Sequence, residues 1–276
     1  MLSQRDSILR LLGDEDTETV NLVERQLIAR GPEILPELRE LVATASGRTE
    51  RRLRETMGEI ERQIAQQTVV QICREFHDES DIEEVTWAIA AALRPDDDFT
   101  ESRKLLDQWA AELANRLREA EGEDEQHEIM SDLLGGELHF RGNEDDYYNV
   151  ENSLLPSVID SRLGIPITLT LIYMFVGKRA GLRVEGVGLP GHFIARIGHA
   201  FFDPFHGGRR MSLEECRKLL ESQGQHLQPQ HLLPSSPVAI LARMLNNLLH
   251  IAVESGDEEM NGIVKGWVDA IQKVGA

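Results

Sequence analysis

The sequence predicts an α+β fold, in which a buried helix and a small antiparallel sheet are flanked by helices on both sides along the chain. Three observations support this prediction. Apolar residues recur at helical spacing through most of residues 1–134. An almost wholly apolar stretch over 167–180 precedes three short strand-like runs within 182–205. Helical spacing then returns after Met211.

Residues 1–66 are expected to be entirely helical, with a break at Gly31-Pro32. The stretch ARGPEILPEL resembles a HEAT-type helical pair. A solenoid normally stacks three or more repeats, so a short helical bundle is an equally good interpretation. We predict a HEAT-like helical domain over residues 1–70. Residues 71–276 are predicted to form a second domain with its core at about 139–211.

Helices are also expected through residues 67–134. Asp81 and Glu84 have the spacing of a capping pair before an apolar helical run, and Pro95 should end that helix. The acidic stretch EGEDE at 121–125 is typical of a solvated helix end or a loop.

The centre of the chain carries the predicted helix and sheet. Pro166 suits a first helical turn and Gly181 a helix end. Three stretches then predict strands, with Gly198-His199 as the hairpin turn between the last two. In order along the chain these stretches are LRVEGVGL, HFIARI and AFFDPF.

Beyond the sheet, Ser212 and Glu215 predict a capping box at the start of a helix. Two amphipathic stretches within residues 235–275, separated by Gly256-Asp257, predict an antiparallel helical pair.

Composition excludes several classes of protein. The 276 residues include 48 acids and 29 Lys or Arg, a net charge of −19. Such a surface repels phosphate backbones, so no nucleic-acid partner is expected. Two cysteines make no disulfide framework. No stretch approaches about 18 consecutive apolar residues and no signal segment is recognised, so we expect a cytoplasmic protein without membrane association.

His192 and Asp203 are the candidate catalytic residues. The predicted hairpin places them on adjacent strands, where an aspartate can fix the tautomer of an imidazole. A buried helix followed by strands bearing His and then Asp suits a Cys–His–Asp hydrolase, with the thiol at the helix start where the dipole favours a thiolate.

Several long motifs then resemble the bacterial SirB1 family, whose core belongs to the transglutaminase-like superfamily. The resemblance spans about residues 75–270 and implies a papain/transglutaminase-like core with His192 and Asp203 at the catalytic His and Asp positions. The motifs are LLDQWAAEL, FRGNEDDYYNVENSLL, the stretch from NSLLPSVID to LPGHFIAR, FFDPFHGG and ARMLNNLL.

The expected thiol is missing. The superfamily carries Gly-x-Cys at the helix start, where this chain has Gly164-Ile165-Pro166. A two-residue shift would place Thr168 there, but a threonine hydroxyl is a weak nucleophile without an adjacent base. In the first helical turn its simpler task is to bond a backbone group. Cys73 lies in a distant helical segment, and Cys216 lies in a helix after the sheet.

Other polar residues have weaker patterns. Asn152, Ser153 and Tyr148 belong to another signature segment of the family and are predicted to bind ligand, although the same loop can be held by its own side-chain bonds. A zinc-type ligand set is conceivable but fits no known spacing, and we predict neither a metal site nor a cofactor. The ligands of that set would be His192, His199, Asp203 and His206.

Two functions follow. The favoured prediction is a binding or regulatory pseudoenzyme that retains a His192–Asp203 cleft for an unidentified protein or peptide and has no Cys-dependent transglutaminase or protease activity. The alternative is an amide hydrolase or acyl transferase that uses Thr168, or an activated water, with His192 and Asp203.

Overall fold

The computed structural model describes residues 4–272 and divides into two compact units. One unit holds the chain up to Val69 together with Ala91–Asp97, and the other holds Val70–Ala90 and the chain from Asp98 onward. The predicted boundary at residue 70 falls inside a continuous helix, α4 (Gly47–Glu75). No helix among the described residues is long and apolar enough to cross a membrane.

Helices of the first unit pack around one core of buried aliphatic residues, among them Leu12, Leu38 and Leu53. Gly31 and Pro32 do interrupt the helices, in a 3-10 turn over Gly31–Ile34. The HEAT-type classification stays a prediction. The helices are α1 (Gln4–Leu12), α2 (Thr17–Ala29), α3 (Leu35–Thr44) and α4 (Gly47–Glu75), which continues into the second unit.

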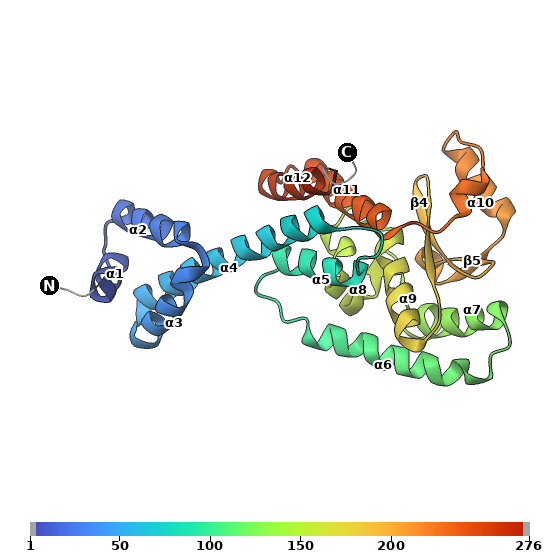
Figure 1. Ribbon diagram of the computed structural model, residues 1–276, viewed down its shortest axis with the longest axis horizontal. Helices are drawn as coiled ribbons and strands as arrows, with labels where there is room; N and C mark the ends of the chain where they lie inside the picture. Colours follow the sequence, from blue (N-terminus) through green and yellow to red (C-terminus); the bar gives the residue numbers. More distant parts are fainter. Residues whose placement is uncertain (1–3, 273–276) are drawn as a thin grey trace. The chain divides into compact units, whose positions relative to one another are not determined.

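The second unit is an α+β structure (Figure 1). Its helices are α5 (Ile82–Leu93), which ends in the first unit, α6 (Thr100–Arg116), α7 (Glu123–Ser131), α8 (Leu155–Ser161), α9 (Pro166–Ala180), α10 (Leu213–Ser222), α11 (Pro237–Ser255) and α12 (Glu258–Gln272). Its four-stranded antiparallel sheet has the order β3 (Glu185–Leu189), β4 (His192–Ile197), β5 (Ala200–Asp203) and β6 (Arg209–Met211).

The sheet packs between α9 and α10. On one face Val187, Ile194 and Met211 form an apolar cluster with Cys216 of α10. Toward the other face, the Tyr173 ring of α9 lies 5.8 Å from the Phe202 ring. As predicted, α9 begins at Pro166, is buried along most of its length and ends at Gly181, whose positive φ closes the helix.

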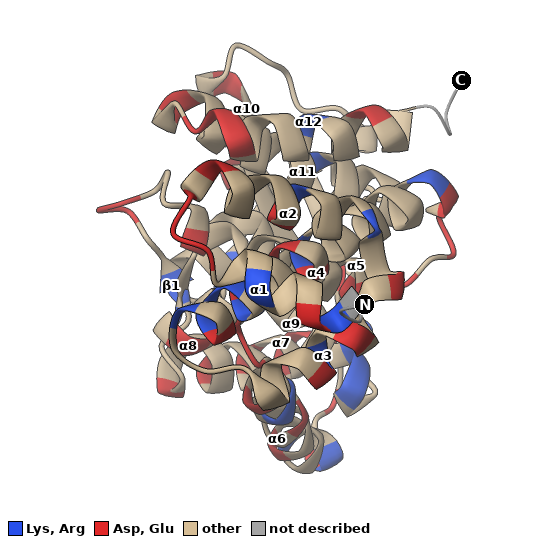
Figure 2. Cartoon of the chain, turned by 90° about the vertical axis from the view of Figure 1, so that its left-hand side faces the viewer, with Lys and Arg blue, Asp and Glu red and all other residues tan. Residues whose placement is uncertain are grey.

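Other predicted features are also present. Ser212 and Glu215 form the capping box of α10, and α11 and α12 are separated at Gly256 and Asp257. The hairpin between β4 and β5 turns at Gly198-His199. Several helices in Figure 2 carry both basic and acidic residues. Within α10, Arg217 forms an ion pair with Glu221.

The sheet differs from the prediction in three ways. The first strand begins at Glu185 rather than at 182. The run AFFDPF ends as a strand at Asp203, because Pro204 cannot donate to a ladder and the chain turns into a 3-10 helix over Pro204–His206. Strand β6 and the short parallel pair β1 (Arg141–Gly142) and β2 (Leu163–Gly164) were not predicted.

The turn after β5 is fixed to α7 through Gly208. Its carbonyl oxygen lies 2.9 Å from both His127 Nε2 and Ser131 Oγ. Gly207 and Gly208 both have positive φ, which returns the chain to β6. This turn carries His206 and therefore determines one side of the site described below.

Replacing Gly208 with alanine should destabilise the protein more than replacing Gly207. Both changes strain a left-handed backbone, at about 1–2 kcal/mol. Only the Gly208 methyl also meets other atoms, 2.5 Å from Ser131 Oγ, whereas nothing lies within 4 Å of a Gly207 methyl. Urea denaturation should show at least about 1 kcal/mol more loss for G208A. Equal losses would contradict the tight packing of this turn.

Candidate functional site

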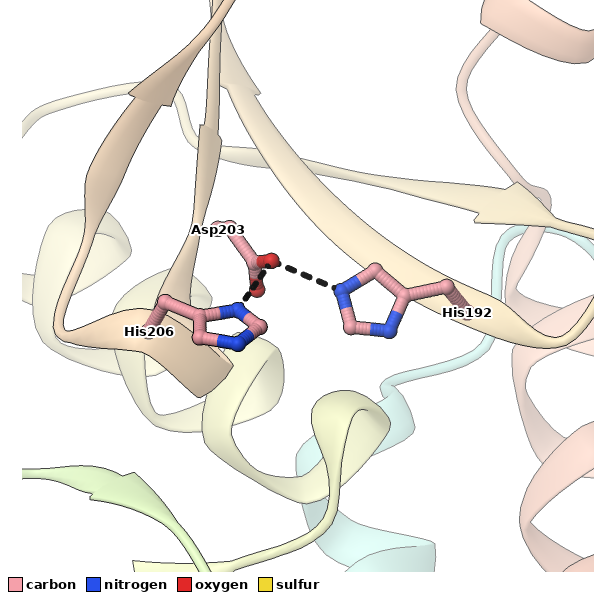
Figure 3. Close-up of side chains that lie close together, drawn as sticks. All are labelled: His192, Asp203 and His206. Carbon is pink, nitrogen blue, oxygen red and sulfur yellow. Dashed lines mark hydrogen bonds and ion pairs between the residues drawn. The ribbon is translucent and has the colours of Figure 1, made fainter. Parts of the chain in front are cut away.

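His192 and Asp203 come together at one end of the sheet. His192 is the first residue of β4 and Asp203 the last of β5. His192 Nε2 lies 2.8 Å from Asp203 Oδ2, as Figure 3 shows. Because Nε2 makes this bond, Nδ1 is the ring nitrogen that remains for another partner. A carboxylate that holds one imidazole nitrogen orients the ring so that the other nitrogen can meet a ligand or a reacting proton.

The Asp203 carboxylate is 2% exposed and accepts from three groups. Besides His192, the backbone N–H of Phe205 donates to Oδ1 at 3.0 Å, and His206 Nδ1 lies 2.8 Å from Oδ2. Burial raises the pKa of Asp203, but the hydrogen bonds and charges of His192 and His206 outweigh it, so the pKa lies below its usual value. The carboxylate is therefore ionised at neutral pH.

His206 also binds Asp203, a contact that the sequence patterns did not predict. It approaches Asp203 from the side opposite His192 (Figure 3), and its side chain is 49% exposed. It also lines a polar cavity of about 560 Å³ with Arg141, Asn143 and Glu144. The stretch FDPFH places His206 three residues after Asp203, but this spacing alone could not show which way the turn faces.

Three of the four residues considered as zinc-type ligands converge. The donor atoms of His192, Asp203 and His206 all lie within 4.8 Å of one another. Two imidazoles and a carboxylate are a donor set that can hold zinc. His199 lies elsewhere, at the hairpin turn, where its backbone N–H donates to Glu123 at 2.7 Å. If a metal binds in the described part of this site, these three residues are its ligands.

Thr168, the candidate nucleophile, is not hydrogen-bonded to His192. Pro166 begins α9, and Thr168, in its first turn, is 1% exposed. Across residues 4–272, no hydrogen bond joins the Thr168 hydroxyl to either ring nitrogen of His192. Cys73 and Cys216 are both buried as free thiols. Burial raises the pKa of Cys73 to about 11 and also raises that of Cys216, which disfavours the reactive thiolate.

The predicted ligand-binding residues have different surroundings. Asn152 is 3% exposed, and its amide nitrogen donates to the carbonyls of Asp146 and Tyr147 at 2.6 and 3.1 Å. The side-chain amide of Asn152 therefore stabilises the loop that contains Asp146 and Tyr147. The hydroxyl of Ser153 is buried without a hydrogen-bond partner among the described residues. Tyr148 is 58% exposed, with its ring 5.5 Å from His250. Their binding roles stay predictions.

The chain is similar to several known proteins. The family described as "Transglutaminase-like superfamily" matches residues 100–246. A UPF0162 protein of Xylella fastidiosa is 39% identical over 121 residues, 40% of this chain and 43% of that protein. A UPF0162 protein of Vibrio cholerae is 25% identical over 192 residues, 64% of this chain and 68% of that protein.

A eukaryotic protein is also similar. Human F-box only protein 21 is 27% identical over 168 residues, which cover 56% of this chain and 26% of that protein. The chain thus spans less than half the length of this protein and of the Xylella relative. No solved structure matches significantly.

Asp203→Asn should give a stability difference that depends on pH. A lowered folded pKa means that the ionised carboxylate stabilises the protein above its unfolded pKa of about 4, and that this stabilisation is lost as pH falls through the folded pKa. The free energy of unfolding should be lower in D203N by about 1.5–3 kcal/mol at pH 5–7, the size of hydrogen bonds to a charged group. This difference in unfolding free energy between the native protein and D203N should narrow below about pH 4.

Urea denaturation of both proteins at several pH values measures this gap. Asp145→Asn is the matched control. Asp145 is exposed and lines the polar cavity beside His206, and it forms no hydrogen bond with His192. A gap that is constant down to pH 2 would contradict the ionised state of Asp203.

Proposed function

Because the chain belongs to the transglutaminase-like superfamily, we propose that it is a binding or regulatory domain that holds a peptide or small ligand at His192 and Asp203 without forming a covalent intermediate. The observation that carries this proposal is an oriented imidazole without a bonded nucleophile. His192 is held by Asp203 at 2.8 Å, whereas the helix beside the site begins at Pro166.

Within the superfamily, we propose that the chain is a SirB1-type protein. The motifs from FRGNEDDYYNVENSLL to ARMLNNLL support this narrower assignment. We also propose that the HEAT-like helices near the N-terminus provide a surface for a protein partner, as helical-repeat surfaces commonly do. The acidic composition and two unpaired cysteines are consistent with a cytoplasmic location and with a partner other than nucleic acid.

The second candidate is an amide hydrolase in which His192 activates a water. It is supported by the orientation of the ring: Nε2 is hydrogen-bonded to Asp203, and among the described residues no side chain is hydrogen-bonded to Nδ1. A base held by a carboxylate needs only a water and a substrate carbonyl within reach. Thr168 as the nucleophile is less well supported, because its hydroxyl makes no bond to His192.

One experiment separates these functions. The purified full chain is dialysed to equilibrium against a pool of N-acetylated tripeptides, and mass spectrometry then measures which peptides are retained and whether any is cleaved. We expect a subset to be retained intact. His192→Ala should reduce its retention at least tenfold, because the ring lies at the centre of the site.

His199→Ala is the matched control, since this histidine is exposed at the hairpin turn and lies outside the cluster. Its retention should equal that of the native chain. Cleavage that depends on His192 would favour the hydrolase instead. Retention of no peptide, or retention unchanged in H192A, would overturn the proposed function.

A further inference from the structure

Arg243 is a half-buried cation that packs on the strand carrying His192. It lies on α11, and its guanidinium carbon is 5.3 Å from the centre of the Phe193 ring. Phe193 directly follows His192 on β4 and pairs with Gly188 of β3. A Cβ at Gly188 would lie 3.4 Å from Arg243 Nη1, so the guanidinium packs closely against this edge of the sheet.

The guanidinium has no acidic partner in the structure. Over residues 4–272, no carboxylate forms an ion pair with Arg243 and no carbonyl accepts a hydrogen bond from it. Two other partly buried arginines are paired: Arg179 contacts Glu83 and Asp107, and Arg196 contacts Glu185. The chain has 48 acidic residues, so the missing partner does not reflect a shortage of carboxylates.

A second partly buried arginine without an ion pair, Arg162, has a different environment. Its guanidinium lies over the rings of Trp109 and Phe140, at 4.5 and 5.0 Å, and the nearby charge of Asp160 favours its charged form. Arg162 therefore packs between two rings, with its Nη1 buried and without a hydrogen-bond partner among the described residues. Arg243 lies over one ring, no carboxylate of the described chain acts on its charge, and none of its nitrogens is buried without a partner.

Aromatic residues connect Arg243 to the dyad. The charge of Arg243 acts on the phenol of Tyr147, where burial raises the pKa of Tyr147 and Arg243 opposes that rise. The Tyr147 ring lies 6.1 Å from Phe205, and the Phe205 ring lies 6.0 Å from His192. Tyr147 is 37% exposed, so this group is open to solvent. Phe205 therefore lies between His192 and Tyr147, and Arg243 packs on Phe193, the residue after His192.

We propose that Arg243 binds a carboxylate of the ligand held at His192. The proposal rests on the proposed function and names the chemical class of its ligand. A planar guanidinium donates two parallel hydrogen bonds to a carboxylate, and partial burial strengthens such a pair. Because no residue of the described chain accepts a hydrogen bond from Arg243, an acidic ligand would displace no internal partner of the guanidinium.

The test uses three forms of each tripeptide in the dialysis experiment: the free C-terminal acid, the C-terminal amide, and an amide that carries an internal glutamate. The free acid should be retained at least tenfold better than the plain amide if Arg243 recognises a chain terminus. The glutamate form should be the preferred one if it recognises an acidic side chain. Either preference supports a carboxylate site.

Three variants assign the preference to a residue. R243Q should abolish it, and R243K, which keeps the charge but loses the planar fork, should reduce it. R141Q is the control, because Arg141 is an exposed cation that lines the cavity beside His206, and it should keep the preference. Thermal unfolding checks that each variant folds, and R243K replaces R243Q if the latter does not.

The outcomes separate the two proposals. Equal retention of acids and amides, with both lost in H192A, would overturn the carboxylate site and leave the binding function intact. A preference that survives in R243K and R243Q, or that disappears in R141Q, would also overturn the assignment to Arg243. Retention of no peptide in any form would overturn both proposals.

Discussion

The buried Asp203 carboxylate is the interaction on which the site depends. It ends β5, receives the backbone N–H of Phe205 and contacts two imidazoles, His192 and His206, through the same oxygen. A carboxylate that is 2% exposed is stable as an anion only when such donors surround it. The sheet register and the turn after Pro204 therefore have to bring both histidines to one point, and Gly208 fixes that turn to α7.

Among the described residues, no nucleophile is hydrogen-bonded to the oriented imidazole of His192. The imidazole of His192 is held in place as a catalytic histidine would be, but the first turn of α9 offers it a proline and a threonine that makes no bond to it. Binding needs only a fixed donor or acceptor and a complementary charge. His192 can provide the first and Arg243, which packs on the next residue of β4, the second, which is why we favour recognition over covalent chemistry.

Local patterns predicted the parts of the fold that depend on neighbours in the chain. The continuous apolar stretch after Pro166, the strand HFIARI and the Ser212–Glu215 capping box each carry their own signal, and all three are present. Strands of two or three residues carry no periodicity, so β1, β2 and β6 could not be predicted.

The site was likewise predicted only in part. The pairing of two adjacent strands predicted that His192 meets Asp203. His206 lies three residues after Asp203 and His199 four residues before it, so spacing does not separate them, and only the turn at Pro204 determines which of them reaches it. Arg243 lies on a helix far along the chain, where the sequence shows one more polar residue in an amphipathic pattern.

The most direct test of this account is the tautomeric state of the histidines, measured by nitrogen-15 NMR of the histidine-labelled chain. If one Asp203 oxygen accepts from both rings, His192 carries its proton on Nε2 and His206 on Nδ1 when both are neutral. The account predicts these opposite tautomers in the native chain, and loss of the Nδ1–H form of His206 in D203N. A native His206 protonated on Nε2 alone would contradict the shared carboxylate and the geometry of the site built on it.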